Sequence, residues 1–239
     1  MLSNRLGRKL IVILGLVIIA ACSGEKIENI PPEEIISNSV VRMRAMPGFS
    51  FLIDRNGAFA FLDPQETISF SRAAGKYVAP DLVDSRIKVI VPGIVAEVKL
   101  ISIGENQWQT NLLTGEWEVM QPGFSFNPSV LFHPDTGIQA ALANDLSELE
   151  YISIDELEEV PGQQLYKLTG KLKGARAYQM SFGLIGPDEL LVTLWIQPVT
   201  FELHRLVVIE VGVNGEEDTE WIIDFWDFDQ IIEISNPMP

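Results

Sequence analysis

The side chains that most often carry chemistry are few in this chain. Its 239 residues contain one cysteine, Cys22, and two histidines, His133 and His204. Neither histidine stands at a metal-ligand spacing from the cysteine or from an acidic residue, so the sequence predicts no metal site and no cofactor. Segment 123–127 (GFSFN) lacks the final glycine of a serine-hydrolase elbow, and the scattered glycines form no phosphate-binding loop. We therefore expect no enzyme and no catalytic residue.

Cys22 follows the pattern of an export signal. Basic residues within 5–9 precede an apolar run over 10–19, and two alanines stand directly before the cysteine. A run of about ten apolar residues is too short to cross a bilayer as a helix but suits the core of a signal peptide. We predict a lipoprotein signal over 1–21, acylation of Cys22, and lipid anchoring on the extracytoplasmic side of the cell membrane. An uncleaved membrane anchor with a chance cysteine is the alternative.

Composition and charge restrict the partners of the exported part. The chain is 47% apolar and 21% charged, and one cysteine leaves no disulfide, so stability must come from a hydrophobic core. Removing the signal removes three basic and no acidic residues, so the formal net charge of -16 becomes -19. This charge disfavours nucleic acid and anionic lipid surfaces as electrostatic partners.

Acidic residues near the C-terminus suggest one alternative. Asp224, Asp227 and Asp229 stand close to Trp221 and Trp226, a combination found in sugar-binding clefts and compatible with calcium binding. Alternation along a strand explains the same residues as a solvated face. The two interpretations remain open at this point, and a test of calcium protection against unfolding would separate them.

The elements around these residues begin with a tether over 22–31 and a single domain over 32–239. Pro32 at a first turn, two following glutamates and apolar residues at helical spacing predict a helix that ends before Pro47. Alternation then begins: Phe49, Phe51 and Ile53 share one face of a predicted strand. Further strands are expected over 67–71, 86–91, 94–103, 107–111, 116–120, 149–157, 164–171, 190–196, 201–211 and 219–228, with two short helices after 127 and 133.

Two of the late strands are apolar at nearly every position. Segments 190–196 and 206–209 do not alternate, so we expect cover on both faces of the sheet. Three modest helices offer limited area to cover a sheet of nine to eleven strands. The excess favours a cavity that takes an apolar ligand, while simple core packing beneath helices is the alternative.

Several segments, in order, resemble the LppX/LprAFG lipoproteins of bacteria. They are Cys22 in its lipobox, the helix ending near residue 46, the stretch 75–80 (GKYVAP), and the run 126–138 (FNPSVLFHPDTGI) preceded by Trp117. The segments 160–170 (VPGQQLYKLTG), 194–198 (LWIQP) and 205–208 (RLVV) follow. Gln197 departs from the acidic residue that family members often carry there.

The resemblance implies an α+β fold similar to LolA and LolB: a strongly bent antiparallel β half-barrel with a few helices on its concave face around an apolar cavity. It implies a carrier that binds lipid or glycolipid acyl chains, with an envelope transporter as a candidate partner and a monomeric chain. A surface-anchored structural or interaction domain without a small-molecule ligand is the alternative. The side chains expected to line the cavity are Val40, Met43, Phe51, Ile53, Phe70, Val98, Leu100, Leu131, Ile138, Leu142, Leu168 and Leu194.

Overall fold

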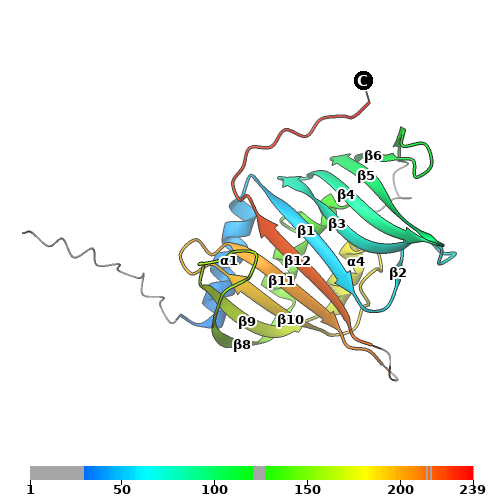
Figure 1. Cartoon of the computed structure of the whole chain (residues 1–239). Coiled ribbons are helices and arrows are strands. Elements are labelled where there is room, and N and C mark those ends of the chain that lie inside the picture. The colour runs from blue at the N-terminus through cyan, green and yellow to red at the C-terminus, as the bar shows by residue number, and fades with distance from the viewer. Residues whose placement is uncertain (1–29, 121–126, 214, 216, 239) are drawn as a thin grey trace, which may run out of the picture.

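One antiparallel sheet forms the frame of the protein (Figure 1). The computed structural model describes residues 30–120, 127–213, 215 and 217–238. Within these residues the sheet has 12 strands. They are β1 (Gly48–Asn56), β2 (Ala60–Phe61), β3 (Ser69–Val78), β4 (Leu82–Val91), β5 (Ile94–Ile103), β6 (Asn106–Thr110), β7 (Trp117–Val119), β8 (Leu146–Asp155), β9 (Leu165–Leu172), β10 (Leu190–Ile196), β11 (Leu203–Glu210) and β12 (Thr219–Trp226).

The strand order fixes which turns lie together. Neighbours follow the order β7-β6-β5-β4-β3-β1-β12-β11-β10-β9-β8, and the short β2 pairs with the start of β3. All the described pairings are antiparallel, so successive turns alternate between the two ends of the sheet. The β4–β5 and β6–β7 turns therefore lie at one end, and the β10–β11 turn lies at the other.

Alternation along β1 sets the inner and outer faces. Phe49, Phe51 and Ile53 are buried on the concave face, as predicted, while Asp54 on the outer face binds a guanidinium. Phe51 stands opposite Phe225 of β12 across the ladder, so the same face continues from strand to strand. The expected large antiparallel sheet with few helices is confirmed.

Four helices are present in the described part of the chain: α1 (Pro32–Ala45), α2 (Ser129–Phe132), α3 (Ile138–Asn144) and α4 (Gly174–Met180). Helix α1 begins with Pro32 and two glutamates and carries Arg42 and Arg44 in its last turn, an arrangement that suits the helix dipole. It packs against α3 and β8. Helix α4 was not predicted. Among the described residues, no helix has the length and apolar character needed to cross a membrane.

The centre of the core is a group of aromatic rings beneath α2. The ring of Phe132 lies 4.6 Å from that of Phe51 and 5.3 Å from that of Phe49, centroid to centroid. Tyr77 and Phe225 complete the group. These rings close the concave face over β1, β3 and β12, where the sheet and the helices meet.

The outer face of the late strands corrects one expectation. Leu194 and Ile196 of β10 are buried inside, but Leu191 on the outer face is 41% exposed. The ring of Trp195 on the same face is half-buried, with the Lys167 ammonium 5.0 Å from its centroid. Cover on both faces, predicted from the apolar composition of 190–196, is therefore wrong for this strand, because cross-strand side chains shield it only in part.

Candidate functional site

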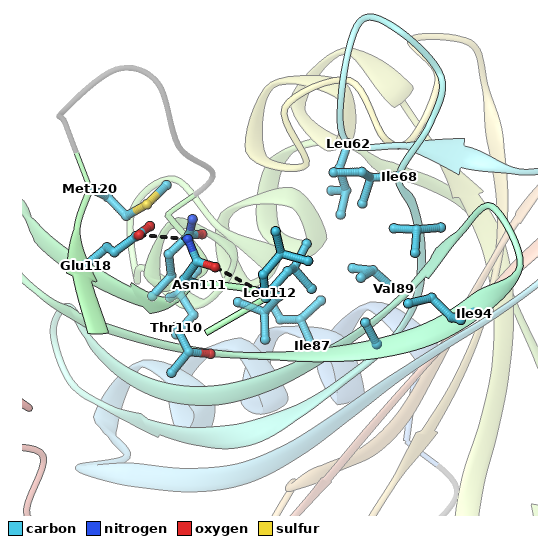
Figure 2. A pocket seen from close by; sticks show the side chains of 16 residues that line it. Leu62, Ile68, Ile87, Val89, Ile94, Thr110, Asn111, Leu112, Glu118 and Met120 are labelled. Atoms are coloured by element: carbon cyan, nitrogen blue, oxygen red, sulfur yellow. Dashed lines mark hydrogen bonds between the residues drawn. The ribbon is translucent and has the colours of Figure 1, made fainter. Parts of the chain in front are cut away.

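A groove opens where the helices end. The described helices pack over the half of the concave face that runs from β8 to β1 and β3, and α2 reaches β4 where Leu131 lies beside Ile87. Among the described residues, no helix lines the groove over the rest of β4 and over β5 to β7. The uncovered strands enclose a cavity of about 580 Å³. Figure 2 shows the side chains that line it, which are mainly aliphatic.

The floor of the groove follows from strand alternation. Ile87 and Val89 of β4 stand beside Val98 and Ala96 of β5 in register, and all four point to the concave face. Leu100 extends the floor toward β6. The intervening positions of the same strands are charged and face outward, so the groove is apolar because one face of each strand is apolar.

The first wall comes from the segment that joins β2 to β3. Leu62 and Ile68 point from this segment toward Val89 and Ile94 (Figure 2). The Asp63 carboxylate holds the segment, since it accepts hydrogen bonds from the backbone N–H of Thr67 at 3.0 Å and of Ile68 at 2.6 Å. This turn therefore fixes two apolar side chains above the sheet.

The second wall is the β6–β7 turn, which presents Leu112 and Leu113 to the groove. The Asn111 side-chain oxygen accepts the Leu113 N–H at 2.9 Å, and its Nδ2 donates to the Glu118 carboxylate at 2.8 Å (Figure 2). Asn111 and Glu118, together with Gln109 and Thr110, form the polar side of a groove that is otherwise apolar. The shape and chemistry of the groove suit an apolar chain with a polar group at one edge.

A second, smaller cavity adjoins the groove. Its volume is about 50 Å³, and Ile87 is a wall of both. Leu131 of α2 and the segment 181–185 after α4 cover it, and Trp221 lies at its side. The small cavity extends the apolar interior from the groove toward the aromatic core.

The structure divides the side chains that the sequence predicted for the cavity into three groups. Val98 and Leu100 line the groove. Phe51, Ile53, Phe70 and Leu131 line the small cavity. The rest lie in the continuous core under the helices: Val40, Met43, Ile138, Leu142, Leu168 and Leu194. Cys22 lies outside the described residues.

Sequence reasoning missed the walls of the groove. Leu62, Ile94, Leu112, Leu113 and Met120 all line it and come from turns or strand ends. A signal was available, because two adjacent leucines in the turn 111–115 and the uncharged run 90–95 (IVPGIV) are unusual for exposed turns.

The histidines take structural positions. His133 follows α2, and its Nδ1 accepts the Asp135 N–H at 3.2 Å, close to the helix start expected for it. His204 is buried against Phe228, and neither ring nitrogen bonds to a described residue. Burial lowers its pKa, partly offset by the nearby Glu202 charge. Within the described residues no group of three or more histidine, cysteine or acidic side chains is placed to hold a metal ion.

The acidic residues near the C-terminus belong to ion pairs and a hydrogen bond. Arg205 donates to Asp224 at 2.5 and 2.9 Å, and Arg42 binds Asp229. The Ser50 hydroxyl donates to Asp227 at 3.1 Å. These carboxylates are held apart by separate partners, which favours the structural interpretation over a sugar or calcium cleft.

Comparison with known proteins identifies the family. The model of the LppX_LprAFG lipoproteins matches residues 31–234. The chain belongs to this family. A search of the curated proteins found no match. Among solved structures, LprF from Mycobacterium bovis has a TM-score of 0.67 at 15% identity, covering 86% of this chain and 96% of its own.

A second structure shows the same fold. Lipoprotein LppX from Mycobacterium tuberculosis has a TM-score of 0.58 at 13% identity, covering 85% of this chain and 98% of its own. A LolA superfamily protein from Nitrosomonas europaea also matches, with a TM-score of 0.31 at 10% identity over 87% of this chain and 96% of its own. The family predicted from the order of the sequence motifs is confirmed.

Proposed function

We propose that the groove over β4 to β7 binds the acyl chains of a lipid or glycolipid and that the protein carries them at or from the outer face of the cytoplasmic membrane. The observation that supports this most directly is the groove itself: about 580 Å³, mainly aliphatic, and uncovered by helices in the described part of the chain. Its volume lies within the roughly 300–1,000 Å³ of small-molecule sites.

The physical task of such a carrier is to keep acyl chains out of water. Exposing apolar surface to water costs about 25 cal/mol of free energy for each Å². A lipid that must expose its acyl chains to water therefore leaves a bilayer slowly. A groove floored by Ile87, Val89 and Leu100 offers an apolar enclosure of comparable chemistry. The carrier role thus rests on binding and release, with no bond made or broken and no catalytic residue required.

The ligand has a preferred orientation in this proposal. Acyl chains lie between the floor and the walls at Leu62 and Leu112, and the polar head group lies near the hydrogen-bonded Asn111 and Glu118. The side-chain oxygens of Glu118 can accept hydrogen bonds from hydroxyl groups, which glycolipid head groups carry. The small cavity beside Ile87 is a place for a chain end.

Location completes the proposal. Acylation at Cys22, after removal of 1–21, would anchor the chain to the membrane, and 22–31 would act as the tether of the single domain over 32–239. Membership of a lipoprotein family supports this anchoring. The carrier is expected to act as a monomer, with an envelope transporter as the candidate donor or acceptor of lipid.

The test combines lipid analysis with a matched pair of variants. Native mass spectrometry and organic extraction should find co-purified lipid near unit stoichiometry, and a fluorescent fatty-acyl probe should bind. Ile94 and Val95 are neighbours, 62% and 67% exposed, but only Ile94 lines the groove. Ile94→Asp should weaken probe binding by about tenfold or more, because it places a charge in the groove, whereas Val95→Asp should bind as the parent does.

Two outcomes would count against the carrier. A lipid-free protein that also takes up no acyl probe leaves the surface-anchored structural domain as the better account. Equal loss of binding in Ile94→Asp and Val95→Asp would place the binding site outside the groove.

A further inference from the structure

The end of the sheet beside the groove carries a cluster of exposed apolar side chains. The β4–β5 turn contributes Ile90, Ile94 and Val95, and the β6–β7 turn at the same end contributes Leu112 and Leu113, of which Leu113 is 94% exposed. The β2 region adds the neighbouring rings of Phe59 and Phe61, 5.9 Å apart. We call the side chains of these three turns the apolar rim. Scattered single apolar residues are ordinary on a surface, whereas a contiguous group indicates an interaction site.

The β4–β5 hairpin is apolar on both of its faces at this end. Val91 and Ile94 point into the groove, while Ile90 and Val95 pair with each other on the outer face. Gly93, with φ of +86°, makes the tight turn between them. A docked protein usually covers one face of a strand and leaves the other in water. A hairpin that is apolar on both faces is better suited to insertion into an apolar phase that contacts both faces at once.

Basic side chains stand directly behind the rim on the outer face. On the outer face of β4, Lys88 lies two positions before Ile90, and two positions further back Arg86 pairs with Lys99 of β5. All three are exposed, and none makes an ion pair with a described residue. Glu97 opposite Lys88 is the one acidic side chain among these four positions. In a chain with net charge -16, this is a locally basic surface complementary to lipid phosphates.

We propose that the apolar rim inserts into a phospholipid bilayer, with the basic side chains at the level of the phosphates. The mouth of the groove then opens into the acyl region, because Val91 and Ile94 belong to both the hairpin and the groove. A lipid enters the groove without passing through water. The transfer step rests on the proposed function, but the insertion of the rim does not.

Insertion depth tests docking independently of lipid binding. The full-length chain is reconstituted into phosphatidylcholine vesicles with and without phosphatidylglycerol, since an N-terminal anchor alone would hold it to the vesicle. An environment-sensitive fluorophore is attached at Val95→Cys or, as a control, at Val199→Cys in the β10–β11 turn at the opposite end. The parent chain measures background labelling of Cys22. The Val95 label should shift to the blue and be quenched by nitroxide lipids, and the Val199 label should not.

The consequence for transfer is tested with charges on the outer face. Ile90→Asp combined with Val95→Asp should slow extraction of a fluorescent phospholipid from vesicles by about tenfold or more, with affinity for a water-dispersed short-chain probe unchanged. The control is Val199→Asp combined with Ile231→Asp, two exposed apolar residues away from the rim. Equal quenching of the two labels, or extraction as fast as in the control, overturns the docking proposal. If the parent chain binds no acyl probe, the carrier function is contradicted. The depth measurement still tests the insertion of the apolar rim in that case.

Discussion

The two halves of the concave face have the same alternating strand pattern, but helices cover one half and the other half lines a groove. Under the helices, Leu168 of β9 and Leu194 of β10 are fully buried in a continuous core. Over β4 to β7, side chains at equivalent inward positions such as Val91 and Ile94 line an open groove. Cover, rather than strand composition, decides whether an apolar face becomes core or binding site.

The difference has a topological origin. Helix α1 packs on α3 and β8, and α2 closes the centre through Phe132, so the described helices cover one side of the sheet. Among the described residues, the other side is lined above the sheet by the short turns that carry Leu62 and Leu112. A sheet of 12 strands within the described residues is thus wider than its helices. The surplus strands form the groove.

The largest expected effect contrasts the two halves in stability. Phe132→Ala removes a ring packed against four other rings and should lower the free energy of unfolding by about 3–5 kcal/mol. Leu113→Ala, at an exposed position in the groove wall, should change it by less than about 0.5 kcal/mol. Urea denaturation of both variants measures the contrast. Comparable losses would mean that the groove wall is part of the folding core.

A second contrast concerns the outer faces of the two halves. Arg205 bridges Asp224 and Glu159 behind the closed half, and the Arg205 and Asp224 side chains are 16% and 17% exposed. Arg205→Met leaves Asp224 without this partner and should cost about 1–3 kcal/mol, between the ranges for buried and for surface pairs. Arg86→Met, behind the groove, should cost almost nothing. Thermal unfolding of the two variants measures their losses of stability. A large loss in Arg86→Met would reveal an ion pair behind the groove.

These contrasts also show what the sequence can predict. Helix α1 and most strands were predicted because caps, prolines and alternation are local signals, as at Pro32 and along β1. The inward face of β1, with Phe51 and Ile53, followed from the same alternation. The family followed from the order of several short motifs along the chain, confirmed over residues 31–234.

The position of the groove did not follow from local signals. Leu168 and Val98 both occupy inward positions of alternating strands. Leu168 lies in the core under the helices, whereas Val98 lines the groove. Only tertiary packing tells these two cases apart, because strand periodicity carries no information about what lies above the strand. Leu62 and Leu113 are turn residues outside any periodic pattern, so strand alternation did not find these walls either.

A third prediction converts the open half into a closed one. Ala96 of β5 lies on the floor of the groove, and Ala96→Trp should fill part of its volume. We expect affinity for an acyl probe to fall by about tenfold, or roughly 1.4 kcal/mol, with little change in stability. Ala74→Trp on the outward side of β3 is the matched control. Binding by fluorescence titration should be unchanged in the control, and unimpaired binding by Ala96→Trp would argue for a site elsewhere.

The smallest expected effect is the pH dependence of the closed half. His204 is buried beside Phe228, and desolvation lowers its pKa below the ordinary 6.5, with Glu202 acting in the opposite sense. The unfolded chain therefore binds a proton more readily than the folded one, and stability falls as pH drops below about 6.5. The slope from one such group is at most about 1.4 kcal/mol for each pH unit. Denaturation from pH 7.5 to 5 should show a shallower slope in His204→Phe than in the parent.

The comparison of the two curves removes the contribution of the other titrating groups. Carboxylates contribute equally to the parent and to His204→Phe, so the difference between the two curves isolates His204. A His204→Phe curve parallel to that of the parent would show that the imidazole reaches water in the folded state. The β10–β11 end of the covered half would then open transiently, and the contrast between a sealed core and an open groove would hold only away from that end.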